Sequence, residues 1–172
     1  MKRRAKPVPI TRSYICDMSS QVPSYRQPSA AELFFNRLFG VFVGLGLGLR
    51  HNYLVQVRGR KSGKLYSTPI DLLEISGKRY LVAPRGRTQW VRNAEAAGEV
   101  MLKKGRTRLR YRIRPLSDPD KPEYLKAYLD RFRTTVQRYF PVPAGSPAQA
   151  FTEVASQYPV FELLPEQAPI SG

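Results

Sequence analysis

One short stretch of the sequence, Gly59–Pro69, combines the side chains and backbone groups that hold a phosphate. It reads GRKSGKLYSTP and lies between two apolar segments. Its two glycines allow the chain to turn tightly and to approach a ligand closely. Successive amide groups in such a turn form an anion-binding nest, to which Arg60 and Lys61 add charge and Ser62 adds a hydroxyl. The stretch therefore predicts an anion-binding turn, and a solvated basic loop is the alternative.

A second candidate site lies at 82–93, where the sequence reads VAPRGRTQWVRN. Pro84–Arg87 favour a turn, and Thr88 is a suitable N-cap for a short helix. The N-terminus of a helix carries a partial positive charge that favours an anion, and Arg85 adds a full charge beside it. The segment predicts a second anion contact, with a plain strand-to-helix turn as the alternative.

Together, the two motifs resemble the deazaflavin-dependent nitroreductases of the flavin/deazaflavin oxidoreductase superfamily. The resemblance is clear over 52–114 and looser over the preceding segment and over 159–163. It implies a mainly β, FMN-binding-like split β-barrel with flanking helices. It also implies an enzyme that transfers a hydride from reduced coenzyme F420 to a small electron-poor acceptor: a quinone, an enone or a nitroaromatic. FMN, FAD and haem are less favoured cofactors.

The resemblance assigns roles to individual residues. Those expected to anchor the deazaflavin phosphate are Arg60, Lys61, Ser62, Gly63 and Arg85. Those expected to position the ring are Thr68, Pro69, Ile70, Gln89 and Asn93. The other expected cofactor contacts are Tyr66, Ser67, Asp71, Val82, Ala83, Pro84 and Trp90. Tyr139 is expected in the acceptor site as a catalytic residue, beside an apolar helix over 33–45.

Two of these residues carry a second interpretation. Tyr66 stands where characterised members of the family have an arginine directed at the phosphate, which puts cofactor choice in question, although Lys64 lies close enough to compensate. Trp90 is the only tryptophan and fits a core position equally well.

His51 is the only histidine of the chain. Its side chain suits proton delivery, because imidazole titrates near neutral pH. A position just before a strand is more typical of a surface or capping residue, and both interpretations stay open.

The elements that must position these residues follow from periodicity and turn signals. Alternating apolar residues and short turns favour a mostly antiparallel barrel. The expected strands are 53–57, 67–75, 79–83, 99–103, 106–115 and 159–164. The expected helices are 30–44, 90–97, one opened by Asp118–Pro119, and 146–156, which a capping box at Ser146–Gln149 opens.

One of these strands carries a row of arginines. Side chains alternate along a strand, so one face holds the arginine row, Arg106, Arg108, Arg110, Arg112 and Arg114, and the other holds core residues. Guanidinium groups bind carboxylates and phosphates, which suits the oligoglutamate tail of coenzyme F420 or an anionic lipid surface. No recognisable nucleic-acid-binding module is present, so a nucleic acid is not an expected partner.

Composition limits the remaining possibilities. The 172 residues fit one domain, expected at 30–165 between a basic arm (1–29) and a short tail (166–172), and the net charge of +16 attracts anions. A single cysteine and a single histidine exclude a disulfide and a usual zinc site, so no metal is expected.

No signal peptide is evident, which predicts a cytoplasmic protein. The segment 33–49 contains Asn36, Arg37 and four glycines, and it suits a packed or interfacial helix rather than a membrane span. Peripheral membrane contact and a monomer or homodimer both fit this sequence. The alternative functions are a non-catalytic carrier of a lipid, flavin or haem, and a basic module that binds membranes or nucleic acids.

Overall fold

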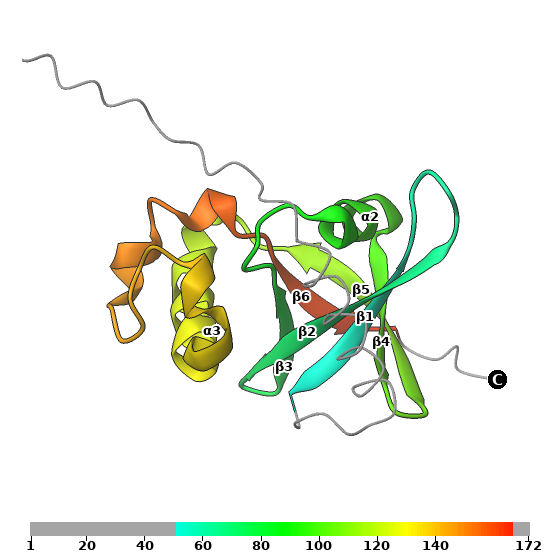
Figure 1. The fold of residues 1–172 in the computed structure, drawn as a ribbon, viewed down its shortest axis with the longest axis horizontal. Coiled ribbons are helices and arrows are strands. Elements are labelled where there is room, and N and C mark those ends of the chain that lie inside the picture. Colours follow the sequence, from blue (N-terminus) through cyan, green and yellow to red (C-terminus); the bar gives the residue numbers. More distant parts are fainter. Residues whose placement is uncertain (1–50, 167–172) are drawn as a thin grey trace, which may run out of the picture.

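The computed structural model describes residues 51–166, whose strands form a closed antiparallel barrel (Figure 1). The strands are β1 (Asn52–Arg58), β2 (Leu65–Ile75), β3 (Lys78–Val82), β4 (Glu99–Lys104), β5 (Thr107–Pro115) and β6 (Val160–Pro165). Their order around the barrel is β1-β2-β3-β6-β5-β4, and every neighbouring pair is antiparallel. The mainly β barrel predicted from the sequence is confirmed.

Two α-helices accompany the barrel in the described part of the chain. Helix α2 (Gln89–Ala97) lies near the end of the barrel where β1 turns into β2, and α3 (Lys121–Val136) lies on one side (Figure 1). Short 3-10 helices follow α3 or flank it: η1 (Asp118–Asp120), η2 (Gln137–Tyr139), η3 (Ala148–Phe151) and η4 (Ala155–Gln157). The predicted basic arm, the predicted helix over 30–44 and the segment 33–49 lie outside the described residues.

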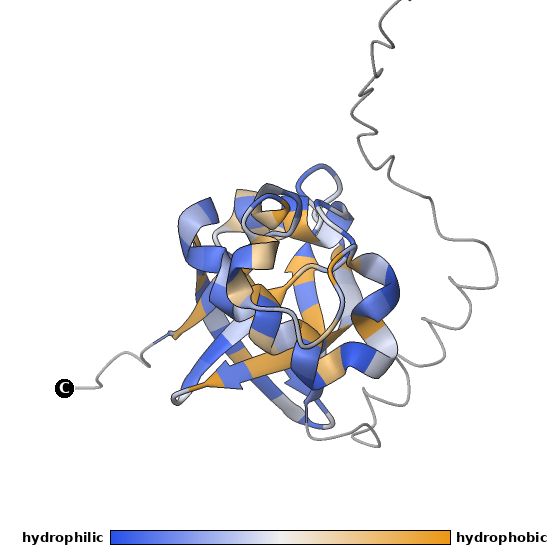
Figure 2. Ribbon diagram, turned by 90° about the vertical axis from the view of Figure 1, so that its left-hand side faces the viewer, coloured by the Kyte–Doolittle hydropathy of each residue, from blue (hydrophilic) through white to orange (hydrophobic). Residues whose placement is uncertain are grey.

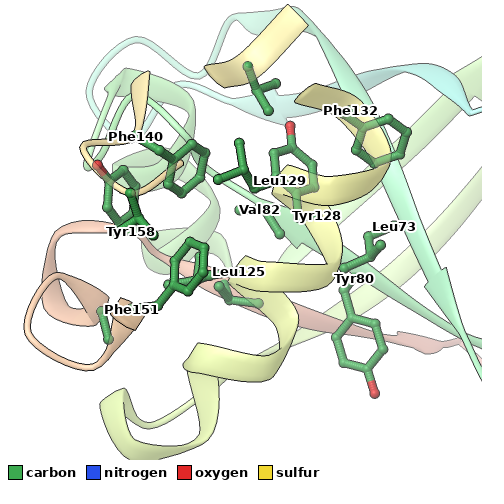
Figure 3. Packing of buried hydrophobic residues seen from close by; sticks show 14 residues of the cluster. Leu73, Tyr80, Val82, Leu125, Tyr128, Leu129, Phe132, Phe140, Phe151 and Tyr158 are labelled. Atoms are coloured by element: carbon green, nitrogen blue, oxygen red, sulfur yellow. The ribbon is translucent and has the colours of Figure 1, made fainter. Parts of the chain in front are cut away.

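The apolar residues form two cores because the strands present side chains to both faces. Val55, Leu81 and Phe161 belong to the barrel interior. Neighbouring strand positions such as Leu73 and Tyr80 face outward and pack under α3 (Figure 3). The strands accordingly show alternating polar and apolar bands in Figure 2. The second core fixes α3 and the segment after it against β2 and β3.

Turn chemistry explains the local shape of two connections. Ser76 and Gly77 between β2 and β3 both have positive φ, 49° and 75°, as a two-residue hairpin turn requires. Gly98 ends α2 with φ 70°, and its N–H donates to the carbonyl of Ala94.

Two helix predictions were wrong in detail. Asp118 does not cap α3, because Asp118–Asp120 form a 3-10 turn and its carboxylate accepts a hydrogen bond from Lys121 Nζ at 2.5 Å. The segment 146–156 is not one α-helix. Pro147 takes the N-cap position of η3. Between η3 and η4 the backbone forms hydrogen bonds three residues apart, such as Val154 N donating to Phe151 O at 3.2 Å.

The arginine row is exposed on β5, as predicted, but the opposite face is only partly core. Tyr111 is buried, whereas Leu109 is 42% exposed. β6 pairs with β5 only from Tyr111 onward, so Leu109 lies where β5 has β4 as its one described neighbour. Arg114 and Lys78 both pair with the buried Glu162, which neutralises one end of the row.

Candidate functional site

The basic turn, Gly59–Lys64, joins β1 to β2 and is held by its own backbone. Gly59 N donates to Lys64 O at 2.8 Å, and Gly63 N donates to Gly59 O at 2.7 Å. Gly63 has φ +66°, where L side chains are strained. A Cβ on Gly59 would lie 2.6 Å from the ring of Tyr66 and 2.7 Å from Ser62 Oγ. Both glycines are therefore required by the shape of the turn.

Tyr66 closes one side of this turn. Its ring lies over Gly59, and its hydroxyl is 3.2 Å from Ser62 Oγ. The residue remains 48% exposed. Tyr66 thus packs against the backbone that a phosphate would approach, and the exposed cations Lys61 and Lys64 lie in the same turn.

Arg60 ties the basic turn to α2. Its Nη1 donates to Asn93 Oδ1 at 2.8 Å and to Gln89 Oε1 at 3.1 Å, and its backbone N lies 3.3 Å from Asn93 Oδ1. Asn93 is only 6% exposed, so its carbonyl oxygen is a fixed acceptor. The structure thereby brings together three of the predicted site residues. Both acceptors of the guanidinium are neutral amides, so these contacts do not offset its positive charge.

The second turn, Pro84–Arg87, lies beside Tyr139. Gly86 has φ +71°, and a Cβ there would lie 3.2 Å from the backbone oxygen of Gln157. The guanidinium of Arg85 lies 5.8 Å from the centre of the Tyr139 ring. Arg138 contacts the same ring at 4.8 Å and donates to the Tyr139 hydroxyl at 2.7 Å. The tyrosine therefore sits among cations, next to the second predicted motif.

Other residues of the second motif point into the protein. The side chains of Val82 and Ala83 are buried, the first under α3 and the second in the barrel. Trp90 is 8% exposed and packs edge-on against Phe161, with ring centres 6.2 Å apart. Thr88 occupies the N-cap position of α2, but its side chain makes no capping bond, and its Oγ1 is buried without a hydrogen-bond partner among residues 51–166.

The segment Ser67–Asp71 of β2 has one open edge. β1 pairs with β2 through Asp71, whereas β3 pairs with it only from Leu72 onward, so no described strand covers the other edge of this segment. Pro69 is compatible with such an edge because it lacks the N–H that a second neighbour would need. Among residues 51–166, this edge of Ser67–Asp71 is therefore not paired with another strand.

Gln56 is a polar residue that the sequence analysis did not single out. Its Nε2 donates to Ser67 Oγ at 2.9 Å, while its Oε1 is buried without a partner in the described structure. A glutamine inside the apolar run of β1 was the available signal. It fixes Ser67 at the start of the open segment.

A cluster around Asp71 completes this region. Asp71 Oδ1 accepts a hydrogen bond from Asn52 Nδ2 at 2.7 Å and lies 3.7 Å from His51 Nε2. Burial raises the pKa of Asp71, although His51, Thr135 and Asn52 act in the opposite direction. Asp71 was predicted as a cofactor contact, but its pairing with His51 was not.

Residues 51–166 lack two features that would point to other functions. No group of three or more His, Cys, Asp or Glu side chains is arranged to hold a metal ion. No helix there is long and apolar enough to cross a membrane.

Solved structures share this architecture at low sequence identity. The protein Atu2129 of unknown function from Agrobacterium tumefaciens matches with a TM-score of 0.52 and 16% identity, covering 84% of this chain and 59% of its own. An F420-H2 dependent reductase, FDR-A, matches with a TM-score of 0.45 and 22% identity, covering 66% and 94%. A FAD-binding protein from Mesorhizobium loti matches with a TM-score of 0.46 and 13% identity, covering 76% of this chain and 89% of its own. The chain thus spans less than two thirds of the Agrobacterium protein, and that likeness supports the fold alone.

Sequence comparison is more specific. No curated protein matches the chain. A family model described as F420H(2)-dependent quinone reductase matches residues 33–140, well over half of the sequence, and this range contains both turns, the open segment of β2 and Tyr139. The chain belongs to the F420H(2)-dependent quinone reductase family, a family of oxidoreductases whose cofactor is coenzyme F420.

Proposed function

We propose that this protein transfers a hydride from reduced coenzyme F420 to a quinone or a similar electron-poor carbonyl acceptor. The observation that carries the proposal is the attachment of Arg60 to Gln89 and Asn93. This attachment joins the basic turn and α2 into one surface, and the two together hold seven of the seventeen residues expected to bind the cofactor.

The basic turn fits the phosphate of the cofactor. Arg60 is held by neutral acceptors and keeps its charge, and Lys61 and Lys64 are exposed beside it. The positive φ of Gly63 and the open face of the turn allow backbone amides to approach an anion. In this proposal Ser62 and Arg85 add a hydroxyl and a second guanidinium.

The segment Ser67–Asp71 fits the deazaflavin ring. Among the described residues no strand pairs with the outer edge of this segment, and Pro69 has no N–H to donate there. When bound, the cofactor supplies the hydride, and the protein contributes orientation and exclusion of water. Thr68 and Ile70, both partly exposed, would fix the ring against β2.

Tyr139 is proposed to border the acceptor. Its hydroxyl accepts a hydrogen bond from Arg138, and its backbone oxygen accepts one from Tyr158 at 2.8 Å. The ring is therefore held in place while remaining partly exposed. A quinone carbonyl would find donors here, since Arg138 and Arg85 both lie at this ring.

The arginine row would attract the acidic tail of the coenzyme. Within the described residues, Arg110 pairs with Glu166 at 3.6 Å and Arg114 with Glu162, whereas Arg108 and Arg112 form no ion pair. Exposed guanidinium groups bind carboxylates, and their contribution falls as salt rises.

The proposal is tested with the full-length protein and purified coenzyme. We expect the deazaflavin to bind at micromolar concentration, and reduced coenzyme to be oxidised when a naphthoquinone is added, followed by its absorbance and fluorescence. Arg60→Ala with Lys61→Ala should weaken binding at least tenfold, whereas Arg92→Ala, on the same helix as Asn93 but without these contacts, should not. Binding without quinone-dependent oxidation would indicate a carrier, and absence of binding would refute the proposal.

A further inference from the structure

The strongest group of reactive side chains outside the two turns is the pair of His51 and Asp71. We propose that His51, oriented by Asp71, donates the proton that accompanies hydride transfer to the acceptor. This inference rests on the proposed function and assigns to it the proton donor that the two turns do not provide.

The pair is built into three elements. Asp71 on β2 faces His51 Nε2 at 3.7 Å and is held by Asn52 of β1 at 2.7 Å. From α3, Thr135 Oγ1 lies 3.5 Å from Asp71 Oδ2 and 3.0 Å from Phe132 O, so its single proton serves either oxygen. The backbone oxygen of His51 accepts from Leu72 N at 2.8 Å. Both the main chain and the carboxylate of this site are thereby fixed.

The imidazole is held on its other side by an apolar ring. His51 lies against Phe132, with ring centres 4.8 Å apart. The side chain of His51 is 28% exposed and that of Asp71 is 16% exposed. Partial exposure lets a small molecule reach the imidazole, while Asp71 stays shielded behind it. With Nε2 directed at Asp71, Nδ1 is the nitrogen left to donate.

The position of the pair links the two regions proposed for catalysis. Asp71 and Pro69 are two residues apart on one strand, so their side chains share a face of β2. On the opposite side, Tyr128 and Phe132 of α3 pack together with ring centres 5.0 Å apart (Figure 3). Burial raises the pKa of Tyr128, and the charges of Asp71 and Tyr139 raise it further. Phe132 in turn contacts His51, so the pair lies beside the proposed ring platform on β2 and against α3, which leads into η2 and Tyr139.

The proton balance of the reaction requires such a group. The acceptor gains a hydride, and its carbonyl oxygen then takes a proton to become a hydroxyl. In the proposed step the imidazolium N–H bond of His51 breaks and the new O–H bond forms, leaving a neutral imidazole that water reprotonates. Oxidation of the bound coenzyme would release one further proton to solvent, so the sum would be one quinone reduced per coenzyme oxidised.

The charged and titratable groups around the imidazole favour this role. Asp71 faces it from β2, with Oδ1 3.7 Å from Nε2. From α3, Tyr128 and Arg131 are nearest: Tyr128 packs on Phe132, and the guanidinium of Arg131 lies 5.7 Å from the same ring while donating to Glu74 O at 3.4 Å. Phe132 thus contacts both Arg131 and the imidazole, and among residues 51–166 the carboxylate that pairs with His51 is that of Asp71.

A single histidine makes the first measurement unambiguous. The imidazole signals in an NMR titration of the cofactor-free full-length protein all belong to His51, since the sequence has no other histidine. In Asp71→Asn the titration curve should move to lower pH, because the carboxylate no longer favours the charged form. Addition of a naphthoquinone should shift the wild-type imidazole signals. An unchanged curve in Asp71→Asn together with no quinone response would overturn the inference.

The second measurement separates catalysis from a structural link. His51→Gln keeps an amide that can donate to Asp71 but cannot titrate. We expect this variant to bind the coenzyme with a Kd within about twofold of wild type and to lose at least tenfold in kcat, in line with general acid catalysis. In wild type, kcat should decline with rising pH in parallel with the NMR titration of His51, and the variant should lack this decline. Added imidazole should restore part of the rate in His51→Gly.

The outcomes distinguish a wrong role for His51 from a wrong proposed function. Wild-type turnover together with an unaltered rate and pH profile in His51→Gln, even with a lower Tm, would show that the pair only joins β1 to α3. A wild-type protein that fails to oxidise the reduced coenzyme would refute the proposed function and this step with it.

Discussion

The side chains of Arg60 and Asn93 join two motifs that are 33 residues apart in the sequence. Both the backbone N and Nη1 of Arg60 use one oxygen of Asn93, at 3.3 Å and 2.8 Å. Because Asn93 is buried in α2, this oxygen sets the position of the basic turn relative to the helix. The contact gives the turn a defined place over one end of the barrel.

Two substitutions at Asn93 should separate the effect of the position of Arg60 on coenzyme binding from the effect of its charge. Asn93→Leu removes the acceptor and should cost about 1 kcal/mol of unfolding free energy, with weaker coenzyme binding because the turn loses its anchor. Asn93→Asp keeps an acceptor but places a negative charge against the guanidinium. The variant should therefore retain its unfolding free energy and still bind the coenzyme more weakly. Calorimetry with the coenzyme and thermal unfolding measure both effects. Wild-type affinity in Asn93→Asp would show that the charge of Arg60 does not contact the phosphate.

Tyr66 provides a test of how far this chain has diverged in its basic turn. Tyr66→Arg adds a cation next to Ser62, so coenzyme binding should tighten at low salt and the gain should fade as ionic strength rises. The loss of the ring from Gly59 should lower the Tm slightly. Tyr66→Phe, which keeps the ring and removes only the 3.2 Å contact with Ser62, is the matched control. Weaker binding in Tyr66→Arg would mean that the tyrosine itself contacts the ligand.

Glu162 should control part of the acid stability. Hydrogen bonds from Arg114, and then from Lys78, hold the pKa of this carboxyl below its ordinary value of 4.5 despite burial. Stability from a depressed carboxyl pKa is present above the unfolded-state value and is lost as pH falls through the folded-state value. Thermal unfolding between pH 3 and 7 should therefore show a steeper acid decline in wild type than in Glu162→Gln, and a lower Tm for the variant at pH 7. Parallel curves for the two proteins would contradict this role.

Asp71 should behave in the opposite way. Burial raises its pKa above 3.8, so the folded state favours the protonated form. The stability linked to this group is full below the unfolded-state pKa and is lost as pH rises through the folded-state pKa. We therefore expect Asp71→Asn to raise the Tm at pH 7 while lowering turnover, the pattern of a residue kept for activity. Thermal scans at pH 4 and 7 test it, and a Tm loss at pH 7 would indicate a structural ion pair instead.

Much of the barrel could be predicted because its signals are local. Alternating apolar residues and short turns were enough to predict β2 and β3 without knowledge of their partners. The prediction of a helix over 146–156 was wrong because a capping sequence carries no information about the tertiary contacts of the segment. Two short 3-10 helices bury Phe151 and Ala155 there instead.

The site was predictable as motifs but not as contacts. Each turn carries its own glycines and cations, so each could be identified alone. The bonds from Arg60 to Asn93 and from Asn52 to Asp71 join residues 33 and 19 positions apart, and they depend on how the barrel closes. Nothing in the local sequence of His51 distinguishes it from a surface residue until Asp71 is placed opposite.

The open segment of β2 has a further consequence for the behaviour of the protein in solution. A strand edge without a neighbour is a template on which another chain can pair and aggregate. Pro69 lies within this segment and cannot donate a hydrogen bond to an incoming strand. The same proline that would support a flat cofactor therefore also protects the edge against intermolecular β-sheet formation.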